Sequence, residues 1–477
     1  RGCRTDRCGD LDFGGHRMIS SLSVFFRNHR GRLLICLLLA LAGWLLSLKI
    51  PPMQSPDENQ HVARAYLLAH GDLTLSTLPS RNSGGWVDGG LVSFINGYMT
   101  LPGNPARHLS ASERAQLDNT PWQGEGSRVY FEIPGTGYYL PLAYLPHAVG
   151  LRAGEWAGLS VDRSYRLARM AVLLACLGLL AWSFSLLRPP SLVLAVLLLP
   201  MSVFQLLSPS LDGLTTSLAL LAISIFLSVL RGGRVTPRWA SWTLATSLLI
   251  VVGSRVHLLP MLLMPFFLFW KHRHRRDLYL GIGLVLASLG WVAYALLSTT
   301  DLRVVRSHGT VEVLRHYLKS PQDYVRVVWR TLLNADLRDF YFRSFVGNLG
   351  WLDAPLRPFF YPWLGVGLCL CALASLSWRK GVEDVQARTV LLAIAIASAS
   401  LVFLALLVTW TPHPASVIAG VQGRYFVVPV LLTAYALGGF GRTRGLWRQC
   451  MDWLLLAAFA GLSLTALILG LQDRFAG

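Results

Sequence analysis

"LLICLLLALAGWLLSLKIPPMQSPDE", residues 33–58, joins a long apolar run to two adjacent acids. The run 33–49 is long enough to cross the hydrocarbon core of a bilayer as a helix. Arginines at positions 17, 27, 30 and 32 precede it, and no small-residue cleavage site follows it. We therefore predict an uncleaved helix that enters the membrane from the cytoplasm. Asp57 and Glu58 then stand where this helix leaves the membrane, and so much charge at that edge needs an explanation.

The composition of the whole chain is that of a membrane protein. Of its 477 residues, 53% are hydrophobic and 14% are charged, and the mean hydropathy is +0.47. Soluble domains carry about 25% charged residues. The net charge of +18 is divided among short basic clusters between apolar runs, the pattern that orients membrane helices. We therefore expect contact with membrane lipids and no nucleic-acid partner.

Apolar runs of about 17–25 residues predict membrane-spanning helices. Eleven candidates lie near 33–49, 166–187, 190–207, 212–230, 239–254, 256–270, 278–298, 359–377, 389–410, 425–440 and 452–471. With the N-terminus inside, the five cytoplasmic loops are all short and basic, as the positive-inside rule requires. The sequence predicts an all-α polytopic membrane protein with about 11 transmembrane helices.

The same topology divides the chain into a tail and one membrane domain. Residues 1–32 are predicted to be a basic cytoplasmic tail, with 1–17 unstructured, and residues 33–477 a single transmembrane domain. Its two large, helical outer loops span 50–165 and 299–358.

The segment 137–159 is apolar but contains two prolines and an arginine. If it crossed the membrane, the basic loops that follow it would lie on the outer side. We predict an interfacial helix on the outer face, with Tyr138, Tyr139, Tyr144 and Trp156 at the headgroup level.

Unusual polar residues gather at the outer turns of this topology. They are Asp57, Glu58, His61 and Arg64 after the first helix, Ser210 and Asp212 in "LSPSLDGL" (207–214), Arg255 and His257 in "GSRVHLL" (253–259), Trp351 and Asp353 in "VGNLGWLDAP" (346–355), and Gln422, Arg424 and Tyr425 in "AGVQGRYF" (419–426). Each turn alone has a structural explanation, such as helix capping by an acid or an arginine that reaches the interface. Two adjacent acids at a bilayer edge are harder to explain without a partner or a task.

Such a set of residues suits transfer from a phosphate leaving group at the membrane surface. Arg255 and Arg424 can bind an anionic phosphate through charge-assisted hydrogen bonds. One acid can accept the proton of an acceptor hydroxyl as the donor carbon is attacked. The other can orient the nucleophile, hold His61 or Arg64, or ligate a divalent cation. A basic outer surface also suits a phospholipid-like donor.

Four motifs resemble a known family. "PPMQSPDENQHVARAYLLAHG" (51–71), "SPSLDGL", "GNLGWLDAP" and "GVQGRYFVVP" are similar, in the same order, to motifs of a bacterial family of predicted polytopic membrane proteins catalogued as a domain of unknown function. The resemblance covers residues from about 33 to 440. That family in turn looks like a branch of the GT-C glycosyltransferase superfamily, which takes sugars from polyprenyl-phosphate carriers and inverts the anomeric centre.

The resemblance implies a GT-C-like fold and a set of roles. Asp57 or Glu58 would be the general base, supported by His61 and Arg64. Arg255, Arg424 and His257 would bind the donor phosphate, and Ser210, Asp212, Trp351, Asp353, Gln422 and Tyr425 would bind substrate. We expect no cofactor and no metal, with a divalent cation (Mg²⁺ or Mn²⁺) on Asp57 as the alternative. The partners would be a polyprenyl-phosphate-linked sugar and a glycan, lipid or protein acceptor, with the active site on the outer face of the bacterial inner membrane.

Two other functions use similar residues. A transporter or flippase for lipid-linked sugars would need polar groups deep within its helices, whereas the predicted spans are nearly all apolar at their midpoints, apart from Gln205 near an outer end. An O-antigen ligase or polymerase acts on similar glycans but needs no acidic pair after its first helix. We therefore favour a membrane glycosyltransferase of the GT-C type.

Overall fold

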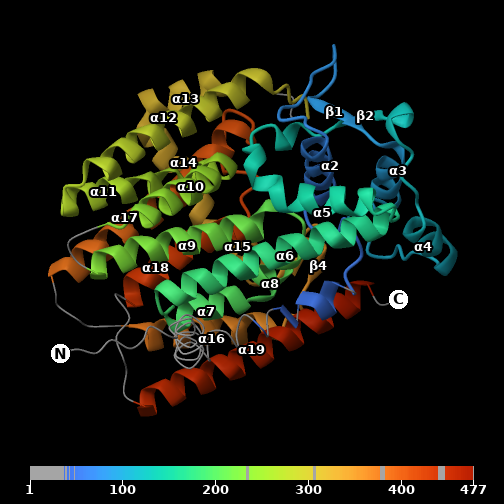
Figure 1. Ribbon diagram of the computed structural model, residues 1–477. Helices are drawn as coiled ribbons and strands as arrows, with labels where there is room; N and C mark the ends of the chain where they lie inside the picture. Colours follow the sequence, from blue (N-terminus) through green and yellow to red (C-terminus); the bar gives the residue numbers. More distant parts are fainter. Residues whose placement is uncertain are drawn as a thin grey trace, which may run out of the picture.

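The chain folds almost entirely into helices (Figure 1). The computed structural model describes residues 37, 40, 41, 43–47, 49–232, 236–303, 308–376, 382–438 and 446–475. The predicted tail 1–32 and most of the first predicted span lie outside this range. Within it, β-structure is confined to two antiparallel pairs, β1 (Gly84–Val87) with β2 (Val129–Glu132) and β3 (Asn348–Leu349) with β4 (Ala354–Pro355).

Among the described residues, five helices are long and apolar enough to cross a membrane. They are α6 (Val161–Leu186), α9 (Leu211–Gly232), α12 (Arg275–Ser298), α17 (Val382–Thr409) and α19 (Leu446–Phe475). The prediction of an all-helical membrane protein is thus confirmed, whereas the count of 11 spans is not.

Shorter apolar helices occupy the other predicted spans that the structure describes. They are α7 (Ser191–Leu198), α8 (Pro200–Leu207), α10 (Arg238–Ser254), η4 (Val256–Leu262), α11 (Leu263–His272), α16 (Phe360–Ser375), η5 (Gly423–Phe426) and α18 (Val427–Gly438). Several predicted spans are divided into two helices, and a proline explains one of these divisions. Pro200 separates α7 from α8 because its ring cannot continue a helix, although it is favourable at a helix start.

The first large loop forms a small body of its own at one end of the molecule, at the right in Figure 1. It comprises α2 (Glu58–Ala69), β1, α3 (Gly89–Tyr98), α4 (Ala111–Asp118), η1 (Glu125–Ser127), β2, η2 (Pro134–Thr136), η3 (Pro141–Tyr144) and α5 (Leu145–Trp156). Its core, which includes Met53, Phe94 and Tyr165, is a separate cluster from that of the spans. Where one interfacial helix was predicted for 137–159, the chain has η3 followed by α5. Pro141 and Pro146 stand at the first turns of these two helices.

The second large loop is also helical. It contains α13 (Thr310–Lys319), α14 (Pro321–Leu333) and α15 (Ala335–Val346), followed by β3 and β4. Buried side chains of α13 and α14, including Val313 and Val327, pack against Phe403 and Leu407 near the end of α17. This loop therefore covers the same end of α17 that leads to η5.

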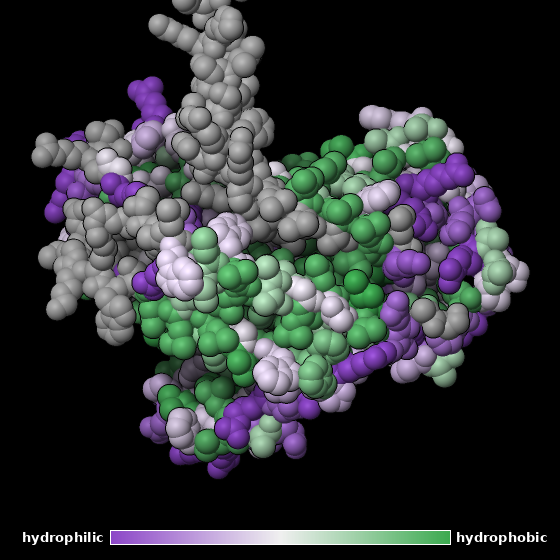
Figure 2. Space-filling model, turned by 90° about the horizontal axis from the view of Figure 1, so that it is seen from below, coloured by the Kyte–Doolittle hydropathy of each residue, from purple (hydrophilic) through white to green (hydrophobic). Residues whose placement is uncertain are grey.

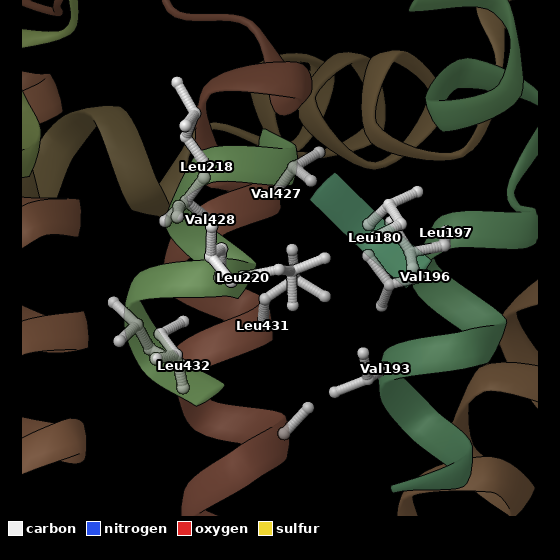
Figure 3. Close-up of a cluster of buried hydrophobic side chains, with 14 of the residues drawn as sticks. Leu180, Val193, Val196, Leu197, Leu218, Leu220, Val427, Val428, Leu431 and Leu432 are labelled. Carbon is white, nitrogen blue, oxygen red and sulfur yellow. The ribbon is translucent and has the colours of Figure 1, made fainter. Parts of the chain in front are cut away.

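An apolar belt crosses one face of the molecule (Figure 2). Figure 2 shows apolar surface across the middle of one face and hydrophilic residues gathered toward its right-hand end. On α19, Leu454 and Ile468 are exposed, as expected of side chains that face lipid. Inside, Val427, Leu431 and Leu432 of α18 lie beside Leu220 of α9, with Leu180 of α6 opposite (Figure 3). This dense core fixes the relative positions of the helix ends that carry the polar turns.

Candidate functional site

The polar centre of the site is one acid that two arginines share. Asp212 lies in the first turn of α9, Arg255 follows the last residue of α10, and Arg424 lies in η5. Arg255 forms an ion pair with Asp212, and Nη1 of Arg424 lies 3.4 Å from Oδ2 of the same carboxylate. The side chain of Arg424 is only 5% exposed. Two cations with one acid leave a net positive charge in a partly enclosed space, where charge interactions are stronger than in water.

A small cavity, partly open to solvent, borders this cluster. Its lining comes from four places in the chain: α8, the first turns of α9, Arg255 with η4, and η5 with the start of α18. Its lining residues are Gln205, Asp212, Thr215, Thr216, Arg255, His257, Leu258, Arg424, Tyr425, Val427 and Val428. One wall is therefore cationic, while Leu258, Val427 and Val428 make another wall apolar.

Tyr139 and His61 extend the site toward the first loop. Nη1 of Arg255 donates to the hydroxyl of Tyr139 over 3.1 Å, and the guanidinium lies 5.2 Å from the centroid of that ring. His61 stacks on Tyr139 with ring centroids 5.9 Å apart, and its Nδ1 lies 2.8 Å from the hydroxyl of Tyr144. Tyr139 thus contacts both Arg255 and His61 and links the cation to the first loop.

Burial keeps these first-loop groups uncharged. It lowers the pKa of His61 to about 3, and the positive charge of Arg255 acts in the same direction. Burial also raises the pKa of Tyr144 well above its usual value. The sequence placed Tyr139 and Tyr144 at the headgroup level because they stand in an apolar segment. The structure places both beside His61.

Asp57 approaches the cation pair from the first loop. It precedes α2 in a left-handed backbone conformation, with φ of 61°, and makes no capping hydrogen bond. Nε2 of Gln60 lies 3.4 Å from its Oδ1. Asp57 is half-buried and lies close enough for its charge to act on Arg424 and Tyr139. Its carboxylate is therefore partly accessible and lies within range of the charge of Arg424.

Glu58 has a different environment from its neighbour. It is buried, accepts hydrogen bonds from the Tyr165 hydroxyl and, over 2.8 Å, from the backbone N–H of Ser55, and lies 3.6 Å from Nη2 of Arg169. Both partners, Tyr165 and Arg169, belong to α6. This ion pair attaches the start of α2 to the membrane helices, so the structure separates the two acids that the sequence placed side by side.

The other predicted site residues are divided between the cavity and its surroundings. His257 and Tyr425 line the cavity with ring centroids 6.4 Å apart. Arg64 lies elsewhere, where it is buried and donates to the carbonyl of Asp72 over 2.9 Å. Ser210 is buried near His147, whose Nε2 lies 3.3 Å from the Ser210 carbonyl. Arg64 thus closes the loop after α2 rather than reaching the cavity.

The Trp-Leu-Asp turn connects loops instead of lining the cavity. Asp353 accepts a hydrogen bond from the backbone of Gly103 over 2.9 Å and lies 3.1 Å from Nη2 of Arg474 at the end of α19. Nε1 of Trp351 donates to the carbonyl of Met53 over 3.0 Å. The turn therefore joins both large loops to the last helix. Gln422 precedes Arg424 and has a buried side-chain oxygen that finds no hydrogen-bond donor among the described residues.

Metal-ligating side chains do not converge in the part of the chain that the structure describes. No group of three or more His, Cys, Asp or Glu side chains there has an arrangement that would hold a metal ion. At the cavity the acid Asp212 is already paired with two arginines. Asp57 stands without a second carboxylate beside it, since Glu58 points toward α6.

Comparison with known proteins identifies a family but no function. Searches of curated proteins and of solved structures gave no match. The family model described as "Predicted membrane protein (DUF2142)" matches residues 38–434, which include all five polar turns. The chain therefore belongs to this DUF2142 family of predicted membrane proteins.

Proposed function

We propose that this protein is a membrane glycosyltransferase that moves a sugar from a polyprenyl-phosphate carrier to an acceptor hydroxyl. The observation that carries the proposal is the sharing of Asp212 by Arg255 and Arg424, with the half-buried Asp57 of the first loop near enough for its charge to act on Arg424. This arrangement combines a receptor for an anionic leaving group with a carboxylate able to accept a proton. The protein would act in the bacterial inner membrane, with the site on the outer face.

The two arginines would hold the phosphate of the donor. Asp212 neutralises only one of them, and the Nε of Arg424 is buried without a partner in the described part of the chain. A phosphate oxygen entering the cavity would supply that partner through a charge-assisted hydrogen bond. Such bonds strengthen as the leaving phosphate gains negative charge, which is the condition for lowering a reaction barrier.

The apolar wall of the cavity would receive the first part of the carrier chain. Leu258, Val427 and Val428 are the aliphatic residues of the lining, and Val427 and Val428 begin α18. A phosphate bound at Arg424 would therefore carry its hydrocarbon along α18 toward the membrane. A free sugar phosphate could use the arginines but gains nothing from these side chains, so the cavity favours a lipid-linked donor.

Asp57 is the better candidate for the general base. An acceptor oxygen would attack the anomeric carbon from the face opposite the phosphate and pass its proton to the carboxylate of Asp57. The bond between the anomeric carbon and the phosphate oxygen would break with its electron pair on the phosphate, which leaves as polyprenyl phosphate, and the configuration would invert. Glu58 would instead hold the loop in place through Arg169.

The charge of the arginines bears on the question of a metal. A divalent cation assists other transferases by stabilising negative charge on the leaving phosphate. Arg255 and Arg424 supply positive charge at that place. We therefore propose a reaction without a divalent cation and expect transfer to persist in excess EDTA. Loss of transfer in EDTA with recovery in Mg²⁺ or Mn²⁺ would instead favour a cation held by Asp57.

The test is turnover by purified protein in lipid vesicles. Lipid-linked sugars extracted from the source cells serve as donors, and we expect released polyprenyl phosphate together with a glycosylated acceptor. Asp57→Asn should lower the rate by at least about 100-fold, the usual scale for a general base, at unchanged thermal stability. Asp323→Asn, on an exposed ion pair of α14, is the matched control.

Two results would reject the proposal. Full activity of Asp57→Asn would remove the catalytic role of the first loop. Movement of labelled lipid-linked sugar across the vesicle membrane without release of polyprenyl phosphate would establish the transporter or flippase instead. Transfer of a preassembled glycan chain from its carrier would favour the ligase or polymerase.

A further inference from the structure

The helical hairpin of α13 and α14, residues 310–333, has an outer surface that its own fold leaves uncovered. At about 100° per residue, Val325, Trp329 and Leu333 lie on one stripe of α14. Trp329 is 62% exposed and Leu333 is 56% exposed. On α13 the corresponding stripe holds Val311 and Leu318, the latter 71% exposed. Contiguous large apolar side chains on a surface indicate a binding surface or membrane contact.

Each of the two helices presents three faces rather than two. On α14, Val327 and Thr331 point inward and are buried. Arg326 and Arg330 are exposed and lie along one border of the apolar stripe. A helix attached to a protein in water needs only a buried face and a polar face. The third, apolar face indicates that these helices contact a medium other than water.

The charge beside the apolar stripe favours a lipid surface. The hairpin carries Arg315, Lys319, Arg326 and Arg330 against two acids, Glu312 and Asp323. Long cationic side chains at the edge of an apolar stripe can lie along hydrocarbon while their charges reach the phosphates of lipid headgroups. Arg326 already pairs with Asp323 over 3.0 Å. Phospholipids supply both chemistries at once, whereas an apolar protein partner would leave Arg315, Lys319 and Arg330 without a complement.

The place of the hairpin in the fold agrees with this occupant. It follows the candidate span α12, and its buried face packs near the end of the candidate span α17. Val402, Phe403 and Leu407 of α17 contact it there, which puts the hairpin close to the end of the apolar belt. A helix pair at the end of a membrane span would meet the boundary between acyl chains and headgroups.

We propose that the α13–α14 hairpin lies in the membrane–water interface, with its apolar stripe in the lipid and its cations at the phospholipid headgroups. This contact would also steady the candidate site. Thr331 Oγ1 of α14 accepts a hydrogen bond from the Ile418 backbone over 2.9 Å, and Ser344 Oγ of α15 accepts one from Gly423 over 2.8 Å. These two backbone groups belong to Ile418 and Gly423, and Gly423 directly precedes Arg424.

Site-directed fluorescence in vesicles tests this proposal without any assay of activity. The full chain, with its native cysteines replaced by serine, receives single cysteines at Val325 and Trp329, each labelled with an environment-sensitive dye. Arg330→Cys, next to Trp329 but on the charged face, is the matched control. The vesicles contain phosphatidylethanolamine and phosphatidylglycerol, with or without lipids that carry a quencher at a known depth.

At positions 325 and 329 we expect emission at shorter wavelength and quenching by shallow lipid-borne quenchers. At position 330 we expect stronger quenching by iodide from the water. Iodide quenching at 325 and 329 equal to that at 330 would overturn the proposal. So would short-wavelength emission that lipid quenchers leave unchanged, since the stripe would then contact a second protein molecule. Two labelled positions on one stripe guard against a single variant that fails to fold.

Discussion

At the residue scale, the two adjacent acids Asp57 and Glu58 have different environments. Asp57 is half-buried, whereas Glu58 is buried against Tyr165 and Arg169 of α6. The unusual pairing of the two acids at a membrane edge marked the first loop as a candidate site. Glu58 differs from Asp57 because it contacts Arg169 and Tyr165. These two residues lie about 100 positions later in the sequence, and only the packing of α6 against α2 brings them to Glu58. For the same reason, the sequence alone does not show that Trp351 contacts Met53 or that Asp353 contacts Gly103 and Arg474.

Glu58→Gln should destabilise the folded protein strongly. The substitution leaves the guanidinium of Arg169 buried without its counter-charge, which typically costs about 3–5 kcal/mol. Thermal unfolding in detergent measures the loss. Adding Arg169→Gln should recover part of it, because the unpaired buried charge is then gone. Glu125→Gln, at an exposed ion pair, is the control and should leave the unfolding temperature unchanged, and an equally small effect of Glu58→Gln would contradict the assignment.

His61 should make stability depend on pH. Its pKa is about 3 in the folded protein because of burial and about 6.5 when unfolded. Above pH 6.5 neither state binds the proton. Between pH 6.5 and 3 only the unfolded state does, so the free energy of unfolding falls as the pH falls. His61→Gln should flatten this decline, with part remaining because the pKa of His147 is also lowered, to about 4.

Unfolding temperatures measured from pH 7.5 to pH 4.5 check this expectation. His108→Gln, at an exposed histidine, is the matched control and should follow the wild type throughout. Equal slopes for the wild type and His61→Gln would show that His61 is not buried in the neutral form.

At the element scale, apolar periodicity located the helices well and their ends less well. The predicted runs coincide with described helices from α6 to α19, because each run must bury or expose apolar surface along its whole length. Pro200 and Pro260 break two of them in ways that a count of apolar residues does not register. The division of 137–159 into η3 and α5 follows from proline positions that were visible in the sequence.

Close packing of α5 on α6 should depend on glycine. A Cβ at Gly150 would lie 2.4 Å from the Cα of Ala168, a backbone atom that cannot move aside. Gly150→Ala should therefore destabilise the protein by about 1–3 kcal/mol, as overpacking usually does. Gly178→Ala on α6 is the control, because its Cβ would meet nothing within 4 Å. Its unfolding temperature should equal or exceed that of the wild type, and equal effects of the two changes would contradict this packing.

At the scale of the whole molecule, short basic loops and polar turns alternate along the sequence. This alternation predicts that the polar turns share one side of the membrane, so that their residues can meet. Turns from 57–61, 212, 255–257 and 424–425 lie at one end, as the derived topology requires. A second polar cluster, with Ser241 Oγ donating to buried Asp277 over 2.6 Å, joins the start of α10 to the start of α12. The sequence could not show how deep each turn lies, which depends on packing among all helices.

The orientation of the chain gives a further test. Ser112 on α4 and Arg275 at the start of α12 are both exposed and belong to opposite ends of the molecule. In cysteine-free protein, Ser112→Cys should react with a membrane-impermeant maleimide in cells whose inner membrane is intact. Arg275→Cys should react only after that membrane is opened. The reverse pattern would place the candidate site on the cytoplasmic face.

Binding of farnesyl phosphate, a short isoprenoid phosphate, to the purified protein tests most directly whether Arg255 and Arg424 form a receptor for a lipid phosphate. Calorimetric titration should show saturable binding that Arg424→Gln weakens by about 10–100-fold, the value of one charge-assisted hydrogen bond. Arg163→Gln, at an exposed arginine of α6, should bind like the wild type. Absence of saturable binding, or equal affinity in Arg424→Gln and the wild type, would contradict the proposed site.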